Sequence, residues 1–278
     1  MTDSKPTSRS LWVREGDRFR ATEASTGPWS RDGLHGGPVA ALFAHLLEHE
    51  PGGEAMFPAR MTVELLRPVG HQPVTVSVGV VRPGKKVRVL DATLSLADAP
   101  DGAATSLARA TLQQIRSAPV PLPVRHREID PDETPPLPTE AAPVTTSRFF
   151  ATEWPAFHNT AVEHRSPDDF FGNLGPAFDW IRVHADLFPG LPLSSFARVA
   201  AAADFGNGVS ATLPVGEYLF VNPDLTIVLD RLPEDEWVGL DARTRVGDSG
   251  VAYAESVLFD RRGRIGRSIQ TLLVDKTV

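Results

Sequence analysis

Alternating apolar and polar residues dominate two regions of the chain. They cover residues 74–81, 87–96 and 106–116 in the first region, and residues 237–246, 251–259 and 265–274 in the second. Many of the apolar positions carry β-branched side chains, and turns containing glycine or proline separate the runs. A two-residue period interrupted by such turns predicts antiparallel strands.

Two shorter segments, residues 39–44 and residues 199–203, are apolar on every side. A Gly-Pro pair precedes the first segment, and proline suits the first position of a helix. Ser194 or Ser195 precedes the second, and a serine hydroxyl caps free amides at a helix start. A helix without a polar face has to be enclosed by the rest of the protein. We therefore expect a buried helix ahead of each strand region, beginning at Gly37 in the first.

Prolines break every periodic pattern between residues 119 and 146, which predicts an extended linker. The linker separates an N-terminal half, residues 10–118, from a C-terminal half, residues 147–278. The halves contain the same order of elements. Aligning them places Thr62 over Thr226 and Arg67 over Arg231. We interpret this as a duplication. The expected fold class is α+β, with two tandem repeats that each wrap a long antiparallel sheet around a buried central helix.

Composition narrows the chemistry that is available. The 278 residues include no cysteine, which excludes disulfides, cysteine–zinc sites and a thiol nucleophile. The net charge of −7 argues against non-specific binding to nucleic acid. No apolar run is long enough for a membrane-spanning helix, and the N-terminus has no apolar core typical of an export signal. A cytoplasmic location is expected, and no cofactor is predicted.

Residues 31–50 support two different interpretations. His45, Glu48 and His49 form an H-x-x-E-H pattern, which occurs on the metal-binding helix of some zinc peptidases. The Leu-His-Gly-Gly-Pro stretch that starts at Leu34 is typical of a glycine entry to a buried helix. The predicted helix stops within two residues of His49, so we favour the second interpretation and predict no metal site.

Five stretches together resemble the double-hotdog acyl-CoA thioesterase family, and within it the thioesterase-like branch related to acyl-CoA thioesterase II. They are Leu-His-Gly-Gly-Pro at residues 34–38, Leu-Arg-Pro at 66–68, Ala-Asp-Phe-Gly-Asn-Gly at 203–208, Phe-Val-Asn-Pro-Asp-Leu-Thr at 220–226 and Ser-Ile-Gln-Thr-Leu-Leu-Val at 268–274. The resemblance covers both halves and excludes only the tails and the linker. It implies two hotdog units fused in one chain.

The resemblance also implies an activity, the hydrolysis of fatty acyl-CoA thioesters, in which an Asp, a Thr and a Gln of the family arrange an attacking water. The Asp matches Asp204 and the Gln matches Gln270, while the Thr position holds Asn222, a departure from the family pattern. An amide can hold a water as a hydroxyl does. The expected substrate is an acyl-CoA, and a homodimer or a higher homo-oligomer is expected.

The glycine loop supplies the substrate-binding candidates, His35, Gly36 and Gly37. Amides at the start of a helix can stabilise the oxyanion that forms from a thioester. Related single-unit enzymes carry a carboxylate nine positions beyond the equivalent of His35, where this chain has Ala44. Ala44 aligns with Asp204 at a spacing of 160 residues, so each half lacks what the other has. One complete site and one without an acid are expected.

Other interpretations stay open. Asp204 could serve only as a turn residue, and Asn222 and Gln270 could face outward from their strands. The basic turns at residues 82–88 and 261–267 are candidates for contacts with CoA phosphates, although such turns are commonly just solvated. The alternative function is a non-catalytic acyl-CoA or acyl-carrier binding protein, because a fold does not determine a function.

Overall fold

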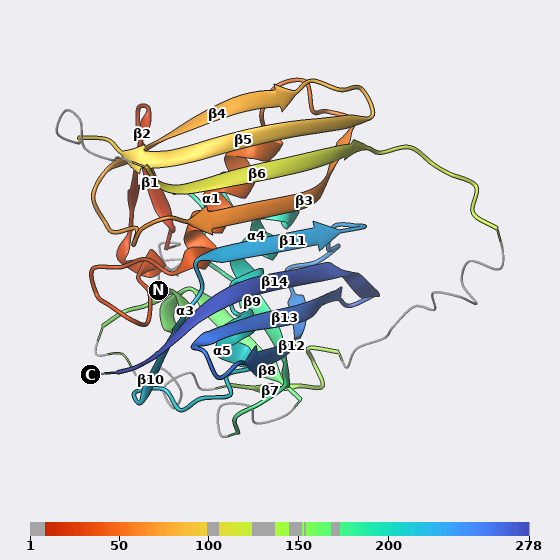
Figure 1. Cartoon of the computed structure of the whole chain (residues 1–278). Helices are drawn as coiled ribbons and strands as arrows, with labels where there is room; N and C mark the ends of the chain where they lie inside the picture. Colours follow the sequence, from red (N-terminus) through yellow and green to blue (C-terminus); the bar gives the residue numbers. More distant parts are fainter. Residues whose placement is uncertain are drawn as a thin grey trace, which may run out of the picture.

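A computed structural model describes residues 9–98, 106–123, 137–144, 152, 154–167 and 173–277. Its strands form a 14-stranded sheet in which every described pairing is antiparallel. Along the sheet the order is β1-β2-β4-β5-β6-β3-β11-β14-β13-β12-β9-β8-β7, and β10 pairs with β14 beside this path. Figure 1 shows the strands of the two halves as neighbouring groups in this sheet.

The six predicted strands are confirmed to within two residues at each end. In the N-terminal half the strands are β1 (Trp12–Glu15), β2 (Arg18–Ala21), β3 (Met56–Leu65), β4 (Val74–Arg82), β5 (Val87–Leu96) and β6 (Ser106–Arg116). In the C-terminal half they are β7 (Ala142–Pro143), β8 (Val162–Ser166), β9 (Ala177–Val183), β10 (Tyr218–Val221), β11 (Asp224–Leu229), β12 (Val238–Val246), β13 (Val251–Asp260) and β14 (Gly263–Lys276).

The halves join through the pairing of β3 with β11. Thr62 lies directly opposite Thr226, and their hydroxyl oxygens are 3.0 Å apart. These are the residues that the duplication aligns, 164 positions apart in the chain. Matching residues face each other where a local two-fold axis passes between antiparallel strands. The order of strands on either side of this pair agrees with such an axis, since β6, β5 and β4 follow β3 as β14, β13 and β12 follow β11.

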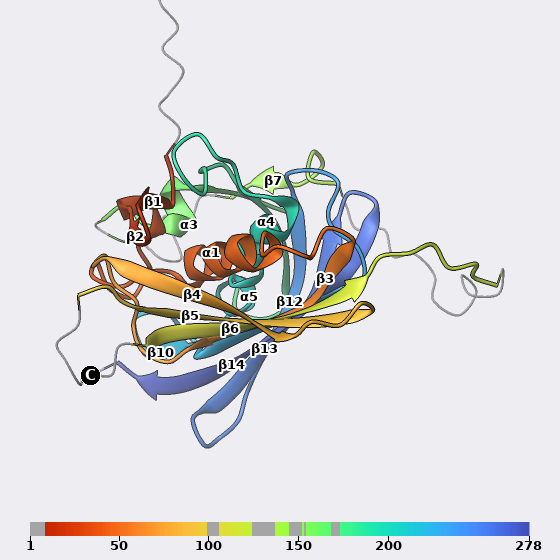
Figure 2. The same ribbon diagram turned by 90° about the horizontal axis from the view of Figure 1, so that it is seen from above.

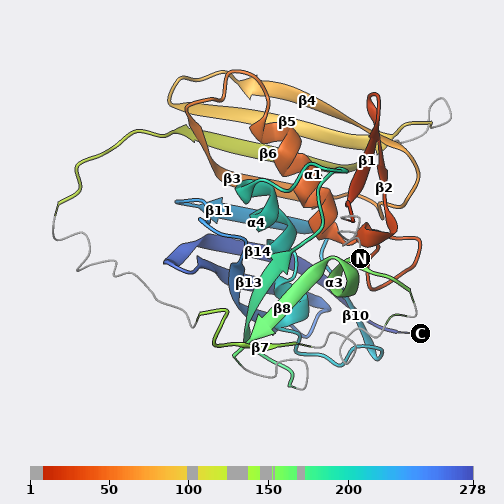
Figure 3. The same cartoon turned by 180° about the vertical axis from the view of Figure 1, so that it is seen from behind.

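Two helices, α1 (Gly36–Glu48) and α4 (Ser195–Ala203), lie side by side on one face of the curved sheet (Figures 2 and 3). Both predicted helices are thus confirmed, and α1 begins one residue earlier than expected. Ser194 is the N-cap of α4, because its hydroxyl accepts the amide of Ala197 at 3.0 Å. Residues 39–44 of α1 and 199–203 of α4 are at most 1% exposed, which explains why these helices lack a polar face.

The sequence patterns missed the short elements at the edges of the sheet. These are β1, β2, β7, β8, β9 and β10, together with the 3₁₀ turn Glu23–Ser25 and the short helices α3 (Phe157–Thr160) and α5 (Gly206–Val209). Most of the missed strands have only four to seven residues, too few for a clear period. β7 lies within the predicted linker and pairs with β8. Residues 124–136 and 145–147 of the linker and of the proposed boundary lie outside the described residues, so the domain boundaries stay a prediction.

No helix among the described residues is long and apolar enough to cross a membrane.

An ion pair with a buried carboxylate fastens the end of β13 to the segment that follows β11. Both nitrogens of the Arg231 fork donate to the Asp260 carboxylate, each at 2.6 Å, and Asp260 is 1% exposed. Burial alone would raise the pKa of Asp260. The hydrogen bonds from Arg231 and from the amides of Arg262 and Glu234 outweigh burial and hold this pKa below its ordinary value.

We predict that Asp260→Asn lowers the free energy of unfolding by about 2–4 kcal/mol at pH 7, because it leaves the Arg231 charge without its carboxylate. A lowered folded-state pKa stabilises the protein above the unfolded Asp pKa of about 3.9, and the contribution disappears as the pH falls through the folded-state value. The difference in free energy of unfolding between wild type and variant should therefore be smaller near pH 3. Urea unfolding at pH 7 and near pH 3 measures this difference. Asp241→Asn, at an exposed residue, is the control. A difference that is equal at the two pH values would contradict this prediction.

Candidate active site

The start of α1 packs directly against the end of α4, and the two glycines of the loop make this possible. A Cβ atom added to Gly36 would lie 2.7 Å from Oδ2 of Asp204. One added to Gly37 would lie 2.6 Å from the carbonyl oxygen of Ala201. Any other residue would push the helices apart, because real Cβ atoms do not approach their neighbours so closely. The loop of the N-terminal half therefore faces the helix of the C-terminal half, as expected.

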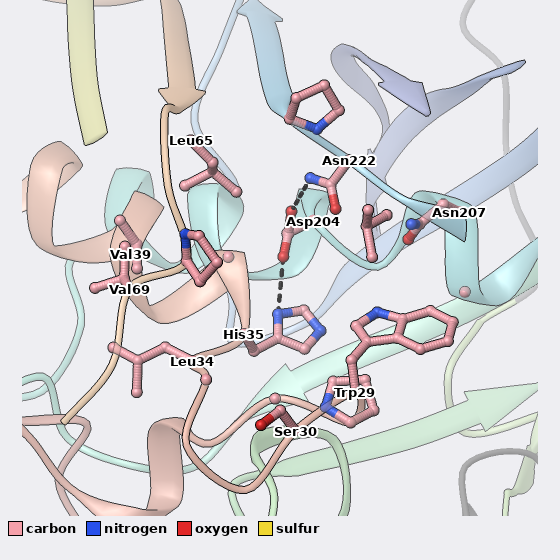
Figure 4. Close-up of a pocket in the computed structure, with 18 of the residues that line it drawn as sticks. Trp29, Ser30, Leu34, His35, Val39, Leu65, Val69, Asp204, Asn207 and Asn222 are labelled. Atoms are coloured by element: carbon pink, nitrogen blue, oxygen red, sulfur yellow. Dashed lines mark hydrogen bonds and ion pairs between the residues drawn. The ribbon is translucent and has the colours of Figure 1, made fainter. Parts of the chain in front are cut away.

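Asp204 is the centre of the polar groups at this contact. It is the C-cap of α4, it is 4% exposed, and polar side chains contact both of its carboxylate oxygens. Oδ2 lies 2.8 Å from Nδ1 of His35. Oδ1 accepts the side-chain amides of Asn222 at 2.8 Å and Gln270 at 3.1 Å. The structure thus brings together four predicted site residues from four separate segments, three of which appear in Figure 4.

Asn222 lies in the two-residue connection between β10 and β11, immediately before Pro223. Its side-chain nitrogen donates to Asp204 and also to the carbonyl oxygen of Asp224, at 3.3 Å. Asn222 is therefore a turn residue in sequence and still faces the carboxylate in space. Its side-chain oxygen is the atom that can accept a hydrogen bond from a water or a substrate.

Gln270 lies on β14 behind Asp204 and is 1% exposed. Its amide nitrogen donates to both the carboxylate and the backbone carbonyl of Asp204, and its oxygen accepts the backbone amide of Asn207 at 3.2 Å. A Cβ atom on Gly206 would lie only 3.0 Å from that oxygen, so the chain turns tightly around the amide. Gln270 holds Asp204 in place and is not among the residues that line the neighbouring cavity.

His35 caps α1 and makes two contacts with one ring nitrogen. Nδ1 lies 3.0 Å from the amide nitrogen of Gly37 and 2.8 Å from Oδ2 of Asp204. A single ring nitrogen either accepts a hydrogen bond or donates one. In the structure Nδ1 accepts the hydrogen bond of the Gly37 amide as the N-cap of α1, and it also lies against Oδ2 of Asp204.

A cavity of about 450 Å³ opens in front of this group. His35, Gly36, Asp204 and Asn222 line it, whereas Gly37 and Gln270 do not. Most of the remaining wall is apolar, including Val39, Leu65, Val69, Phe205, Val209, Phe220 and Leu273. A mostly apolar cavity with a few convergent polar groups is the usual form of a site for a small organic ligand.

Sequence reasoning missed several polar residues of the cavity wall, among them His158, His164 and Asn207. His164 stands on β8, where Val162, His164 and Ser166 are buried and the residues between them are not. That alternation marks His164 as inward-facing. The signal was present, but the strand is too short to be recognised from its pattern alone.

The H-x-x-E-H residues gather at the other end of α1. Potential ligand atoms of His45, Glu48 and His49 lie within 4.8 Å of one another. The Glu48 carboxylate accepts a hydrogen bond from the hydroxyl of Ser194, the N-cap of α4, so it also fastens the two helices together. Burial, His49 and Arg14 lower the pKa of His45 to about 4. None of these three residues lines the cavity.

The predicted basic turns need a correction at Arg88. Its side chain is 4% exposed, and its guanidinium donates to the carbonyl oxygens of Glu50 and Pro51. Arg88 therefore holds the segment after α1 and is not a contact for a phosphate. The cavity wall instead contains Arg67, an exposed arginine whose guanidinium also donates to the carbonyl oxygen of Ser106 at 2.9 Å.

Comparison with known families agrees with this geometry. Residues 25–113 match the acyl-CoA thioesterase N-terminal domain, and residues 131–274 match the acyl-CoA thioesterase C-terminal domain. The chain belongs to the acyl-CoA thioesterase family. It is therefore a thioester hydrolase. None of the curated proteins matches it.

Solved structures of similar proteins support the fold. A candidate thioesterase II from Thermobifida fusca YX superimposes with a TM-score of 0.67 at 16% identity, covering 98% of this chain and 99% of that one. A hotdog-fold protein of unknown function from Alicyclobacillus acidocaldarius gives a TM-score of 0.67 at 17% identity, covering 96% of both chains. The acyl-CoA thioesterase II TesB2 from Mycobacterium marinum gives a TM-score of 0.63 at 14% identity, again covering 96% of both chains. The chain thus has a hotdog fold.

We predict that Gly36→Ala lowers the kcat of thioester hydrolysis about 10- to 100-fold while the protein stays folded. The added methyl group would displace the Asp204 carboxylate, and a displacement of about 1 Å at a reacting group has this order of effect. Gly33→Ala is the matched control in the same loop, because its Cβ would lie 3.8 Å from the nearest atom. CoA release and circular dichroism measure both variants, and equal rates for the two would disprove the role of the Gly36 contact.

Proposed function

We propose that this thioester hydrolase is an acyl-CoA thioesterase with one working site per chain, built between two fused hotdog units. The observation that carries the proposal is the buried Asp204 carboxylate, held by His35, Asn222 and Gln270 at the wall of a mostly apolar cavity. Family membership supports an acyl-CoA substrate. The corresponding position of the other helix, Ala44, has no acid and is fully buried.

In the proposed reaction, Asp204 acts as general base toward a water in the cavity. The carboxylate takes a proton from the water as its oxygen attacks the thioester carbonyl carbon, forming a tetrahedral intermediate. The carbon–sulfur bond then breaks, and the proton passes to the departing CoA sulfur. Free acid and CoA are the products. Gln270 acts indirectly, because it positions Asp204 and does not reach the cavity.

The glycine loop would stabilise the charge on the attacked carbonyl oxygen. Gly36, the first residue of α1, lines the cavity, and a backbone amide at the start of a helix can donate to such an oxygen.

Asn222 would do the work of the family Thr. Its nitrogen donates to Asp204, and its oxygen remains to orient the water, whereas a hydroxyl does both with one atom. The cytoplasmic location and the homo-oligomeric state remain predictions.

The first experiment measures CoA release from saturated acyl-CoA substrates of increasing length. We expect Asp204→Asn to lower kcat about 10²- to 10⁴-fold, because the general base is lost. Gln270→Ala should lower kcat less, since the Asp204 carboxylate remains. Exposed Asp241→Asn is the control and should match the wild type. Unchanged turnover in Asp204→Asn would exclude the proposed mechanism.

The same assay separates the enzyme from the alternative, a non-catalytic binding protein. Titration with acyl-CoA by calorimetry would detect binding without release of CoA, and that result would favour the alternative. Asn222→Thr should retain activity, whereas Asn222→Leu, which cannot hydrogen-bond, should lose it. Equal activity of these two variants would disprove the role of Asn222.

We also predict that Arg67→Ala raises KM for acyl-CoA about 3- to 10-fold with little change in kcat. Arg67 is exposed where it lines the cavity, and a guanidinium binds phosphate groups well. The matched substrate is the same acyl group on pantetheine, which lacks the nucleotide phosphates. Its KM should not change, and an equal rise in KM for both substrates would contradict a phosphate contact.

A further inference from the structure

The helices α1 and α4 meet at both of their ends, and each meeting point joins an N-cap to a carboxylate. At the proposed active site, the N-cap of α1, His35, contacts Asp204 at the end of α4. At the opposite end, the N-cap of α4, Ser194, donates its hydroxyl to the carboxylate of Glu48, the last residue of α1. The half that lacks an acid at Ala44 therefore has a carboxylate about one turn further along its helix.

Two histidines accompany this second carboxylate. His45 and His49 lie four residues apart, so they share a face of α1, and their ring centroids are 4.4 Å apart. His45, Glu48 and His49 each offer one potential ligand atom, and these atoms all lie within 4.8 Å of one another. No other set of three such ligands gathers in this way in the part of the chain that the structure describes.

Each of the three side chains keeps an acceptor atom that the described residues do not use. Nδ1 of His49 donates to the carbonyl oxygen of His45 at 2.8 Å, which leaves Nε2 of His49 with its lone pair. Metal-binding histidines are commonly oriented by such a hydrogen bond from their other ring nitrogen. Oε1 of Glu48 accepts from Ser194, and Oε2 has no hydrogen-bond partner among the described residues. The ring of His45 packs edge-on against Phe188, and its nitrogens form no hydrogen bond within the described residues.

Two imidazoles and one carboxylate are a ligand set that zinc binds, with water in the fourth position of a tetrahedron. Imidazole nitrogens favour zinc over magnesium or calcium, which prefer oxygen ligands. We propose that His45, Glu48 and His49 bind one Zn²⁺ ion. The ion joins the end of α1 to the start of α4, because the hydroxyl of Ser194 holds the carboxylate of Glu48.

This site differs from that of a zinc peptidase, in which the glutamate of the motif is a general base. Such an enzyme needs a further ligand from another segment, and the end of α1 at Glu48 counts against that arrangement. Here Glu48 is itself a ligand, so the last turn of α1 and its C-cap, His49, supply the whole set. None of the three residues lines the cavity, so the role of the ion is structural.

The test titrates zinc chloride into the full-length chain, produced without a histidine tag and stripped of metal with a chelator. Calorimetry should show one Zn²⁺ per chain with a Kd on the order of 10 µM, weaker than a zinc-finger site. The positive charge of Arg14, which acts on His45, opposes a bound cation and keeps the affinity in this range.

Three variants remove one ligand each. His45→Gln and His49→Gln should weaken the binding of Zn²⁺ by about tenfold or more. Glu48→Gln should also weaken it, but this variant still offers an oxygen to the hydroxyl of Ser194, so the contact between the helices is kept. His184→Gln, at an exposed histidine near the end of β9, is the control and should bind Zn²⁺ as the wild type does.

Thermal unfolding gives a second readout, because an ion that binds only the folded chain raises its Tm. Zn²⁺ at about tenfold above Kd should raise the Tm of the wild type and of His184→Gln by about 2–5 °C. The same concentration should move the Tm of His45→Gln and His49→Gln by less than about 1 °C.

Two outcomes would overturn the inference: no saturable binding of Zn²⁺ with a Kd below about 100 µM, or wild-type affinity in both histidine variants. Neither outcome bears on the thioesterase proposal, because the release of CoA is assigned to residues at the other end of the two helices.

Discussion

The close contact between α1 and α4 is the constraint on which the site depends. Gly36 and Gly37 let the start of one helix touch the end of the other, with Gly36 against Asp204 and Gly37 against the backbone of Ala201. Both helices are apolar on all sides, so the sheet has to cover them. Because the glycines come from one half and the carboxylate from the other, the polar group forms only when the halves pack together. The pairing of β3 with β11 keeps them in register.

Burial of a carboxylate at this contact is tolerable because its hydrogen bonds replace water. Asp204 accepts from Asn222 and Gln270 on one oxygen and lies against His35 on the other. The carboxylate therefore keeps a fixed direction toward the cavity, which a general base requires. The buried His164–Asp179 pair, whose Nδ1 and Oδ2 atoms are 2.6 Å apart, extends the same principle across Phe205. One wall of a mostly apolar cavity is thus polar and ordered before any substrate enters.

The two halves of the chain share a plan and differ in detail. Asp204 has Ala44 as its counterpart in α1, so only the C-terminal half has an acid at this position. The carboxylate of Asp260, at the end of β13, accepts hydrogen bonds from Arg231. The matching strand β5 ends at Leu96, which offers no carboxylate. Arg67, which the duplication aligns with Arg231, lines the cavity. Duplication followed by such changes leaves the glycine loop of one half in contact with the carboxylate of the other.

The sequence by itself determined the elements whose patterns are long and local. It predicted six long strands, both buried helices and a serine cap at Ser194 or Ser195, because periodicity and capping act between residues close in the chain. Resemblance to a family added Asp204 and Gln270 as site candidates. Only the tertiary structure decided that Gln270 lies behind the carboxylate, that Arg88 is buried and that His164 faces the cavity. Those properties depend on distances between segments far apart in the chain, and no local pattern of residues encodes such distances.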